Sequence, residues 1–168
     1  VIGLGRRLEG FTQPLSKKSN NVNLAYLCDV MPSQLDKAAK TFSGLINYSP
    51  KLENDIRKVL EDKQLDAIFN ATPDHWHARI AIDALEAGKD VYLEKPLTYS
   101  IEEGQKLVKA VRDNNKILAV GSQQRSDPNF QHAVKLVQDG KLGKIEKVEV
   151  FLGKEMPHPK PYDLPEEV

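Results

Sequence analysis

The chain has very few of the features that mark several large protein classes. It holds one cysteine, Cys28, so it cannot form an internal disulfide. It has no excess charge, because 24 lysines and arginines balance 24 aspartates and glutamates. It also has no apolar run that approaches the length of a membrane span. We therefore expect no disulfide scaffold, no membrane partner and no nucleic-acid partner, since binding nucleic acid needs basic residues to neutralise phosphates.

Both ends of the sequence lack features that a complete protein would show. The chain opens with no initiator methionine and with little strand before its first glycine, Gly3, so we expect it to begin inside a strand. It closes on a proline-rich stretch, residues 156–165, which can build no core. We therefore expect a truncated chain. We predict a cytoplasmic protein and leave periplasmic export open, because any export signal would precede residue 1 and its absence here carries no information on localisation.

Short β-branched runs alternate with longer amphipathic stretches along most of the chain, which is typical of a parallel sheet wrapped by helices. The pattern predicts an α/β fold with a Rossmann-type, doubly wound parallel sheet. The expected strands are residues 1–4, 23–28, 46–48, 66–71, 90–93 and 117–120. The expected helices are residues 8–18, 33–42, 53–62, 76–87 and 101–114.

The pattern changes after Gly121. Asp127 and Pro128 are typical of an N-cap followed by the first residue of a helix, expected over residues 129–138. Residues 144–153 alternate charged and apolar side chains, which predicts a strand with one face in water. We therefore expect one domain over residues 1–121 and the beginning of a second over residues 122–168.

The glycines Gly3 and Gly5 lie after the first expected strand and before the first expected helix. This is the context in which a glycine pair lets the backbone turn and approach the pyrophosphate of a dinucleotide. The full fingerprint has a third glycine where this chain has Leu8, so the helix must pack against the sheet in another way. Arg6 and Arg7 are either groups that screen phosphate charge or solvated residues of a helix start.

Asp29 follows the second expected strand, 24 positions beyond Gly5. A carboxylate at this place accepts hydrogen bonds from an adenosine ribose and repels a 2′-phosphate, so the sequence favours NAD over NADP. The alternative is an aspartate that caps the helix before Pro32.

The run from Thr72 to His77 ends the fourth expected strand and opens a helix, with Asp74 as the expected N-cap. The backbone at this place can face the ribose of a cofactor. His75 and His77 point in different directions at a helix start, and no cysteine or carboxylate cluster completes a coordination shell, so we predict no metal site. His77 is interpreted as a structural residue that holds this turn.

Glu94, Lys95 and Pro96 end the fifth expected strand. Ligands of open α/β sheets bind at the carboxyl ends of the strands, so Lys95 is placed where a substrate can reach it. The alternative is an ordinary surface lysine.

Together these motifs resemble the Gfo/Idh/MocA family of oxidoreductases. The resemblance also includes the runs 121–125 and 140–145, and it covers the family's amino-terminal cofactor domain and the entry into its carboxyl-terminal domain. It implies that residues 1–121 bind NAD(P) and that residues 122–168 begin the domain for substrate binding and oligomerisation. It implies binding of NAD, with NADP also possible, at these matching positions: Gly3, Gly5, Arg6, Asp29, Thr72, Pro73, His77, Glu94, Lys95, Pro96, Gln124 and Arg125.

The resemblance implies hydride transfer between the nicotinamide and a carbinol carbon of a sugar, cyclitol or related polyol. Lys95 would touch the reacting hydroxyl and stabilise a developing alkoxide, Glu94 would orient the lysine, and the Lys95–Pro96 bond is often cis. The family usually supplies the base as a histidine in an Asp-x-x-x-His arrangement, but Asp127 and His132 are five apart. We therefore expect the general base beyond residue 168, an inactive fragment and a homo-oligomeric full-length protein.

Two other functions remain open at this point. One is an NAD-dependent glycosidase of the same fold, although Lys95 favours a dehydrogenase because the resemblance associates this lysine with dehydrogenases. The other is a non-catalytic sensor that binds a nicotinamide cofactor.

Overall fold

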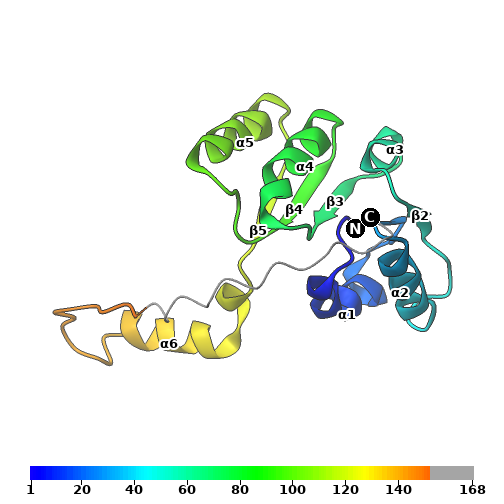
Figure 1. The fold of residues 1–168 in the computed structure, drawn as a ribbon. Coiled ribbons are helices and arrows are strands. Elements are labelled where there is room, and N and C mark those ends of the chain that lie inside the picture. Colours follow the sequence, from blue (N-terminus) through cyan, green and yellow to red (C-terminus); the bar gives the residue numbers. More distant parts are fainter. Residues whose placement is uncertain (152–168) are drawn as a thin grey trace, which may run out of the picture. The chain divides into compact units, whose positions relative to one another are not determined.

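The computed structural model describes residues 1–151 (Figure 1). Its strands are β1 (Tyr26–Cys28), β2 (Lys51–Glu53), β3 (Ala67–Asn70), β4 (Asp90–Glu94) and β5 (Leu118–Gly121). Its α-helices are α1 (Thr12–Ser16), α2 (Pro32–Ser43), α3 (Ile56–Glu61), α4 (Asp74–Glu86), α5 (Ile101–Asp113) and α6 (Pro128–Gln138). Three 3-10 helices complete the described part: η1 (Arg6–Phe11), η2 (Lys18–Asn20) and η3 (Gln123–Ser126).

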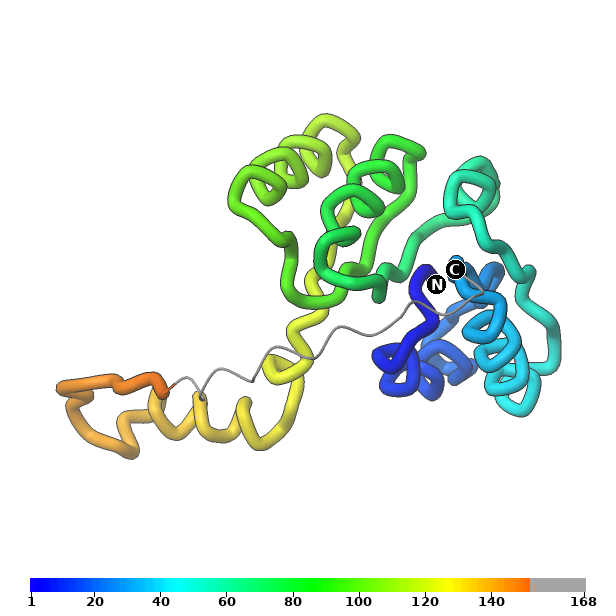
Figure 2. The backbone as a smooth tube through the Cα atoms, in the orientation of Figure 1, coloured from blue at the N-terminus to red at the C-terminus, as the bar shows by residue number. Residues whose placement is uncertain are grey.

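Every strand pair in the described sheet is parallel. β1 pairs with β2, and β3, β4 and β5 pair in that order. Ile2 joins the two groups, because it forms parallel bridges to Cys28 at the end of β1 and to Asn70 at the end of β3. The start of the chain, dark blue in Figure 2, accordingly lies between the two groups of strands. The predicted Rossmann-type parallel fold is confirmed.

Helices cover both faces of this sheet, and each face buries its own apolar cluster. Successive residues of a strand point to opposite faces, so Leu27 and Cys28 of β1 belong to different clusters. Leu27 packs with residues of η1 and α2, whereas Cys28 packs with residues of α3, α4 and α5. The sheet is therefore a middle layer between two sets of helices.

Two compact units divide the described residues. The first runs from Val1 to Gly121 and holds the whole sheet, and the second begins at Ser122 and contains η3 and α6. Asp127 caps α6 as expected, because its carboxylate accepts a hydrogen bond from the backbone N–H of Asn129 at 2.8 Å. No helix within residues 1–151 is long and apolar enough to cross a membrane.

The expected strand at residues 46–48 is wrong. The strand that pairs with β1 is β2, which begins five residues after the expected start and is polar and largely exposed. Ile46 instead packs against the cluster beneath α2, and the Tyr48 hydroxyl accepts a hydrogen bond from the backbone N–H of Leu24 at 2.9 Å. Apolar character at these two positions serves packing, while an exposed edge strand carries no apolar signal.

The expected helix over residues 8–18 is also different. The chain forms η1 and then the short α1, and the side chain of Leu8 is buried in the cluster that includes Leu4 and Leu27. This burial shows how the chain packs without the third glycine of the fingerprint. The glycine would allow close approach of a helix, whereas Leu8 fills the space between η1 and the sheet.

Two further expectations do not hold. Residues 145–151 form no strand, and within residues 1–151 no neighbouring strand pairs with them, as a strand requires. Asp74 is the first residue of α4 rather than its N-cap, which is Pro73. Residues 152–153 of the expected strand, and the proline-rich stretch 156–165, lie outside the described residues.

We predict that Leu8→Ala lowers the free energy of unfolding by about 2–5 kcal/mol, because it removes buried methyl groups from a packed cluster. The measurement is denaturant unfolding, with Leu45→Ala as the matched control. Leu45 is 38% exposed, so its truncation costs less than about 1 kcal/mol. Equal losses in the two variants would contradict the packing role of Leu8.

Candidate functional site

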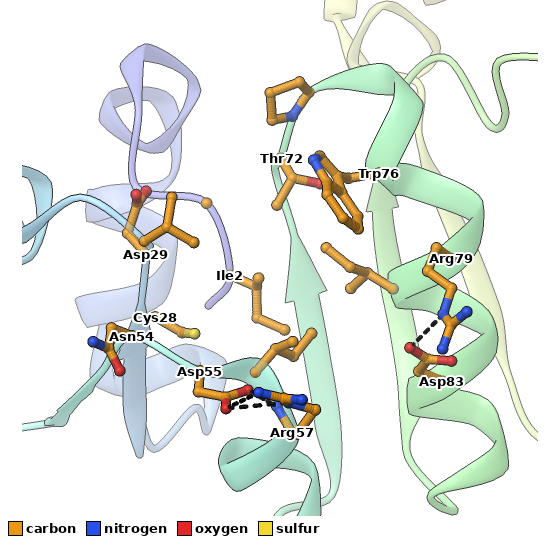
Figure 3. A pocket seen from close by; sticks show the side chains of 15 residues that line it. Ile2, Cys28, Asp29, Asn54, Asp55, Arg57, Thr72, Trp76, Arg79 and Asp83 are labelled. Atoms are coloured by element: carbon orange, nitrogen blue, oxygen red, sulfur yellow. Dashed lines mark hydrogen bonds and ion pairs between the residues drawn. The ribbon is translucent and has the colours of Figure 1, made fainter. Parts of the chain in front are cut away.

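A pocket of about 770 Å³ lies where the sheet divides at Ile2. Its lining comes from the carboxyl ends of β1, β2 and β3 and from α4 (Figure 3). In open parallel sheets this switch point is the usual place for ligands, and the volume is that of a small-molecule site. The lining residues are Ile2, Gly3, Cys28, Asp29, Val30, Asn54, Asp55, Ile56, Arg57, Thr72, Pro73, Trp76, Arg79, Ile80 and Asp83.

The carboxylate of Asp29 ties the glycine loop to the end of β1. One oxygen accepts a hydrogen bond from the backbone N–H of Leu4 at 2.7 Å, and the other accepts from the N–H of Met31 at 3.0 Å. Met31, not Asp29, is the N-cap residue of α2. A carboxylate has about four acceptor positions, so Asp29 retains capacity for the hydroxyls of a ligand in the pocket.

The two glycines have different physical roles. Gly3 has a φ of +81°, and an added Cβ would lie 2.7 Å from the backbone of Ala71 and Thr72. The fold itself therefore requires glycine at this position. Gly5 has an ordinary φ of −73°, and a Cβ there would meet nothing within 4 Å. The space beside Gly5 is open for a ligand.

The end of β2 contributes pocket residues that the sequence pattern did not reveal. Asn54 and Asp55 line the pocket just before α3, where a continuous helix over residues 53–62 was expected. Asp55 caps α3 and pairs with Arg57, and these contacts lower the pKa of Asp55 to about 2. An aspartate two residues before an arginine at a helix start was the available signal.

Helix α4 forms the opposite wall. Trp76, Arg79 and Asp83 lie along this wall in Figure 3, and the last two form an ion pair at 2.8 Å. Cys28 lies at the end of β1 in the same pocket, and burial raises the pKa of its thiol to about 11. The sequence placed Trp76 in the correct helix, but not in a pocket wall, because that depends on the distant strands β1 and β2.

His77 lies behind the pocket rather than in it. Its side chain is 1% exposed, with Nδ1 2.6 Å from the carbonyl oxygen of Pro96 and Nε2 2.8 Å from that of Thr72. Asn70 supports the same turn, since its side-chain oxygen accepts hydrogen bonds from the N–H and the hydroxyl of Thr72. His77 therefore holds a pocket residue, Thr72, and the residue after Lys95 in one buried network.

Glu94 is the last residue of β4 and Lys95 follows it, and the two side chains have different surroundings. Glu94 is 3% exposed and forms an ion pair with Arg7 at 3.0 Å, whereas Lys95 is exposed. Within the described residues Glu94 makes no ion pair with Lys95, because neighbouring residues of an extended chain point to opposite sides. The expected orienting contact is therefore replaced by Arg7. The Lys95–Pro96 bond is cis, as the resemblance implied.

The remaining expected site residues are divided between the two units. Arg6 opens η1 and is exposed, directly after Gly5. Gln124 and Arg125 lie in η3 of the second unit. The structure thus brings Gly3, Asp29, Thr72 and Pro73 together in the pocket lining, while the other expected residues lie outside that lining.

Comparison with known proteins finds similarity to one family of oxidoreductases. The Gfo/Idh/MocA model, described as an oxidoreductase family with an NAD-binding Rossmann fold, matches residues 1–122. The scyllo-inositol 2-dehydrogenase (NAD(+)) of Bacillus subtilis is 31% identical over 144 residues, which are 86% of this chain and 41% of the relative. The chain therefore spans about two fifths of the length of such relatives.

Solved structures show the same similarity. The myo-inositol 2-dehydrogenase of Lactobacillus plantarum matches with a TM-score of 0.76 and 29% identity, over 86% of this chain and 41% of that chain. The scyllo-inositol dehydrogenase of Lactobacillus casei, solved with bound NAD(H) and scyllo-inositol, matches with a TM-score of 0.75 and 27% identity. That match covers 84% of this chain and 41% of the other.

We predict that His77→Gln lowers the free energy of unfolding by about 1–3 kcal/mol, because it leaves a buried carbonyl without its partner. Thermal or denaturant unfolding measures the loss. His75→Gln is the matched control, since His75 is exposed on the same helix and its substitution changes stability by about 0.5 kcal/mol or less. If His77→Gln were as stable as the control, the network would contribute nothing to the fold.

Proposed function

The chain belongs to the Gfo/Idh/MocA family of oxidoreductases, and from this premise we propose that it is the NAD-binding part of a dehydrogenase. The reaction we propose is hydride transfer between NAD and a carbinol carbon of an inositol, a related polyol or a sugar. The observation that carries the proposal is the pocket at the switch point of the sheet, where Asp29 holds the glycine loop in place.

The residues of the pocket, together with Gly5 of the adjoining glycine loop, fit a dinucleotide. Gly3 brings the loop within contact of Thr72, and the open space beside Gly5 admits a pyrophosphate to the backbone. Asp29 offers acceptors for ribose hydroxyls and repels a 2′-phosphate, which supports NAD over NADP. The half-exposed ring of Trp76 offers an apolar face to a base.

Lys95 is the residue that we assign to the chemistry. A bound nicotinamide would accept or supply the hydride. Lys95 is exposed at the carboxyl end of β4, and its ammonium group stabilises negative charge on a reacting hydroxyl. The negative charge of Glu94 is already compensated by Arg7, so Glu94 does not neutralise the ammonium group of Lys95. We propose that a residue outside this chain acts as the general base.

Several wider properties belong to the same proposal. The relatives are more than twice as long as this chain. We therefore propose the substrate, the homo-oligomeric assembly and the cytoplasmic location for the whole protein and not for this part alone. We also propose that residues 1–121 are the NAD-binding domain and that the substrate domain begins at Ser122. Neither the NAD-dependent glycosidase nor the non-catalytic sensor is favoured, since the named relatives are dehydrogenases.

We predict that calorimetry detects NAD(H) binding to the chain, with weaker binding of NADP(H). Gly5→Val weakens NAD(H) binding by about tenfold or more, because the new side chain occupies the space that the pyrophosphate needs. The variant keeps its fold, since nothing lies within 4 Å of a Cβ at Gly5. Circular dichroism checks this condition.

Three outcomes of the calorimetry contradict parts of the proposal. If a folded sample binds neither cofactor, the pocket is not a dinucleotide site. If NADP(H) binds more tightly than NAD(H), the role assigned to Asp29 is wrong. Unchanged binding by Gly5→Val would place the pyrophosphate away from the glycine loop.

We predict that Lys95→Ala in the full-length protein lowers the rate of inositol or polyol oxidation by about 100-fold or more, because the developing alkoxide loses its stabilising charge. NADH absorbance measures the rate, and calorimetry confirms that NAD still binds. Release of a sugar with no net NADH would indicate the glycosidase. Oxidation that is unaffected by Lys95→Ala would remove Lys95 from the chemistry.

A further inference from the structure

Arg7 makes the longest-range ion pair near the glycine loop. Its guanidinium nitrogen Nη2 lies 3.0 Å from Oε1 of Glu94, which is 87 positions away in the sequence. Glu94 is buried at the end of β4, and Arg7 is the second residue of η1, directly after the loop. The contact therefore connects the segment that approaches a cofactor to the strand that carries Lys95.

The carboxylate of Glu94 occupies space that is free only because residue 121 is a glycine. A Cβ added to Gly121 would lie 2.7 Å from Oε1 of Glu94 and 2.8 Å from the hydroxyl of Tyr92. Burial and the nearby Glu94 carboxylate also raise the pKa of Tyr92. The neighbouring strand β5 thus leaves room for the charge of Glu94, which Arg7 then compensates.

Aromatic rings complete the attachment of η1 to the sheet. The Phe11 ring lies 4.5 Å from the Phe69 ring and 5.9 Å from the Tyr92 ring, measured between centroids. The guanidinium carbon of Arg7 lies 4.5 Å from the centroid of Phe11. Arg7 and Phe11 therefore hold η1 against β3 and β4, while Leu8 of the same 3-10 helix packs with Leu4 and Leu27.

Within the part of the chain that the structure describes, the attachment leaves one polar group of Arg7 unsatisfied. The Nε of Arg7 is buried and has no hydrogen-bond partner within the described residues. Leaving such a donor unpaired is unfavourable, and an apolar pair of similar volume avoids both this cost and the burial of charge. Buried polar groups without a hydrogen-bond partner are concentrated at functional sites.

We propose that Arg7 is a positioning residue for the cofactor. By pairing with Glu94 it fixes η1, and η1 fixes the loop, because the N–H of Leu8 donates to the carbonyl of Gly5 at 3.0 Å. This inference rests on the proposed function. It concerns the part of the ligand that meets the loop, the pyrophosphate, and not the base or the adenosine ribose, whose contacts lie elsewhere in the pocket.

The experiment compares two probes that differ at the pyrophosphate. ADP-ribose carries a pyrophosphate but no nicotinamide, so it cannot touch the reaction centre, and adenosine carries neither. Calorimetry measures ADP-ribose and NAD. The fluorescence of Trp76, the only tryptophan of the chain and a pocket residue, follows adenosine. The variants are Arg7→Met, Glu94→Gln and the double variant, with Arg112→Met, an exposed arginine of α5, as the matched control.

We expect Arg7→Met to raise the dissociation constants of ADP-ribose and NAD by about tenfold, while that of adenosine changes less than about twofold, because only the loop is displaced. Glu94→Gln has a similar effect on ADP-ribose, and the double variant is no worse than either single variant. The double variant also recovers stability, since no unpaired charge remains buried. Its affinity for ADP-ribose does not recover.

Three results would overturn the inference while the proposed function stands. They are unchanged ADP-ribose binding by Arg7→Met, an equal loss for adenosine, and recovery of ADP-ribose affinity together with stability in the double variant. The last result would make Arg7 a residue of stability alone. If the unmodified chain bound neither NAD nor ADP-ribose, the proposed function itself would be wrong.

Discussion

The backbone of Ile2 joins the two halves of the sheet, and the site depends on this junction. Its N–H donates to the carbonyl of Phe69 and its carbonyl accepts from Ala71, each at 2.8 Å, while Gly3 and Cys28 extend the pairing on the other side. From this central position the chain builds the sheet in opposite directions, first through β1 and β2 and later through β3, β4 and β5. The pocket lies where the two directions diverge, and residues at the ends of both groups of strands line it.

Residues at this junction make structural contacts that also shape the pocket. Asp29 holds the loop through the N–H of Leu4 and retains further acceptor capacity in the pocket lining. His77 holds Thr72 of the pocket and the carbonyl of Pro96, next to Lys95. Loss of such a residue changes geometry before it removes a ligand contact. Separate measurements of stability and affinity are therefore needed to assign its role.

The sequence predicted the elements that have strong local patterns. The amphipathic stretches that became α2, α4 and α5 and the apolar strands β3 and β4 lie close to their expected positions. The exposed strand β2 was misplaced, since its pairing with β1 and not its composition makes it a strand. Its misplacement hid Asn54 and Asp55, two pocket residues that follow it.

The sequence by itself determined the alternating α/β pattern, the glycine loop, Asp29 and the motif that contains Lys95, because each depends on residues that are close along the chain. Only the tertiary structure decided that Leu8 fills the place of a glycine contact, that His77 lies behind the pocket and that Arg7 rather than Lys95 pairs with Glu94. These contacts join residues many positions apart. Their partners are selected by packing across the sheet, which leaves no periodic signal in the sequence.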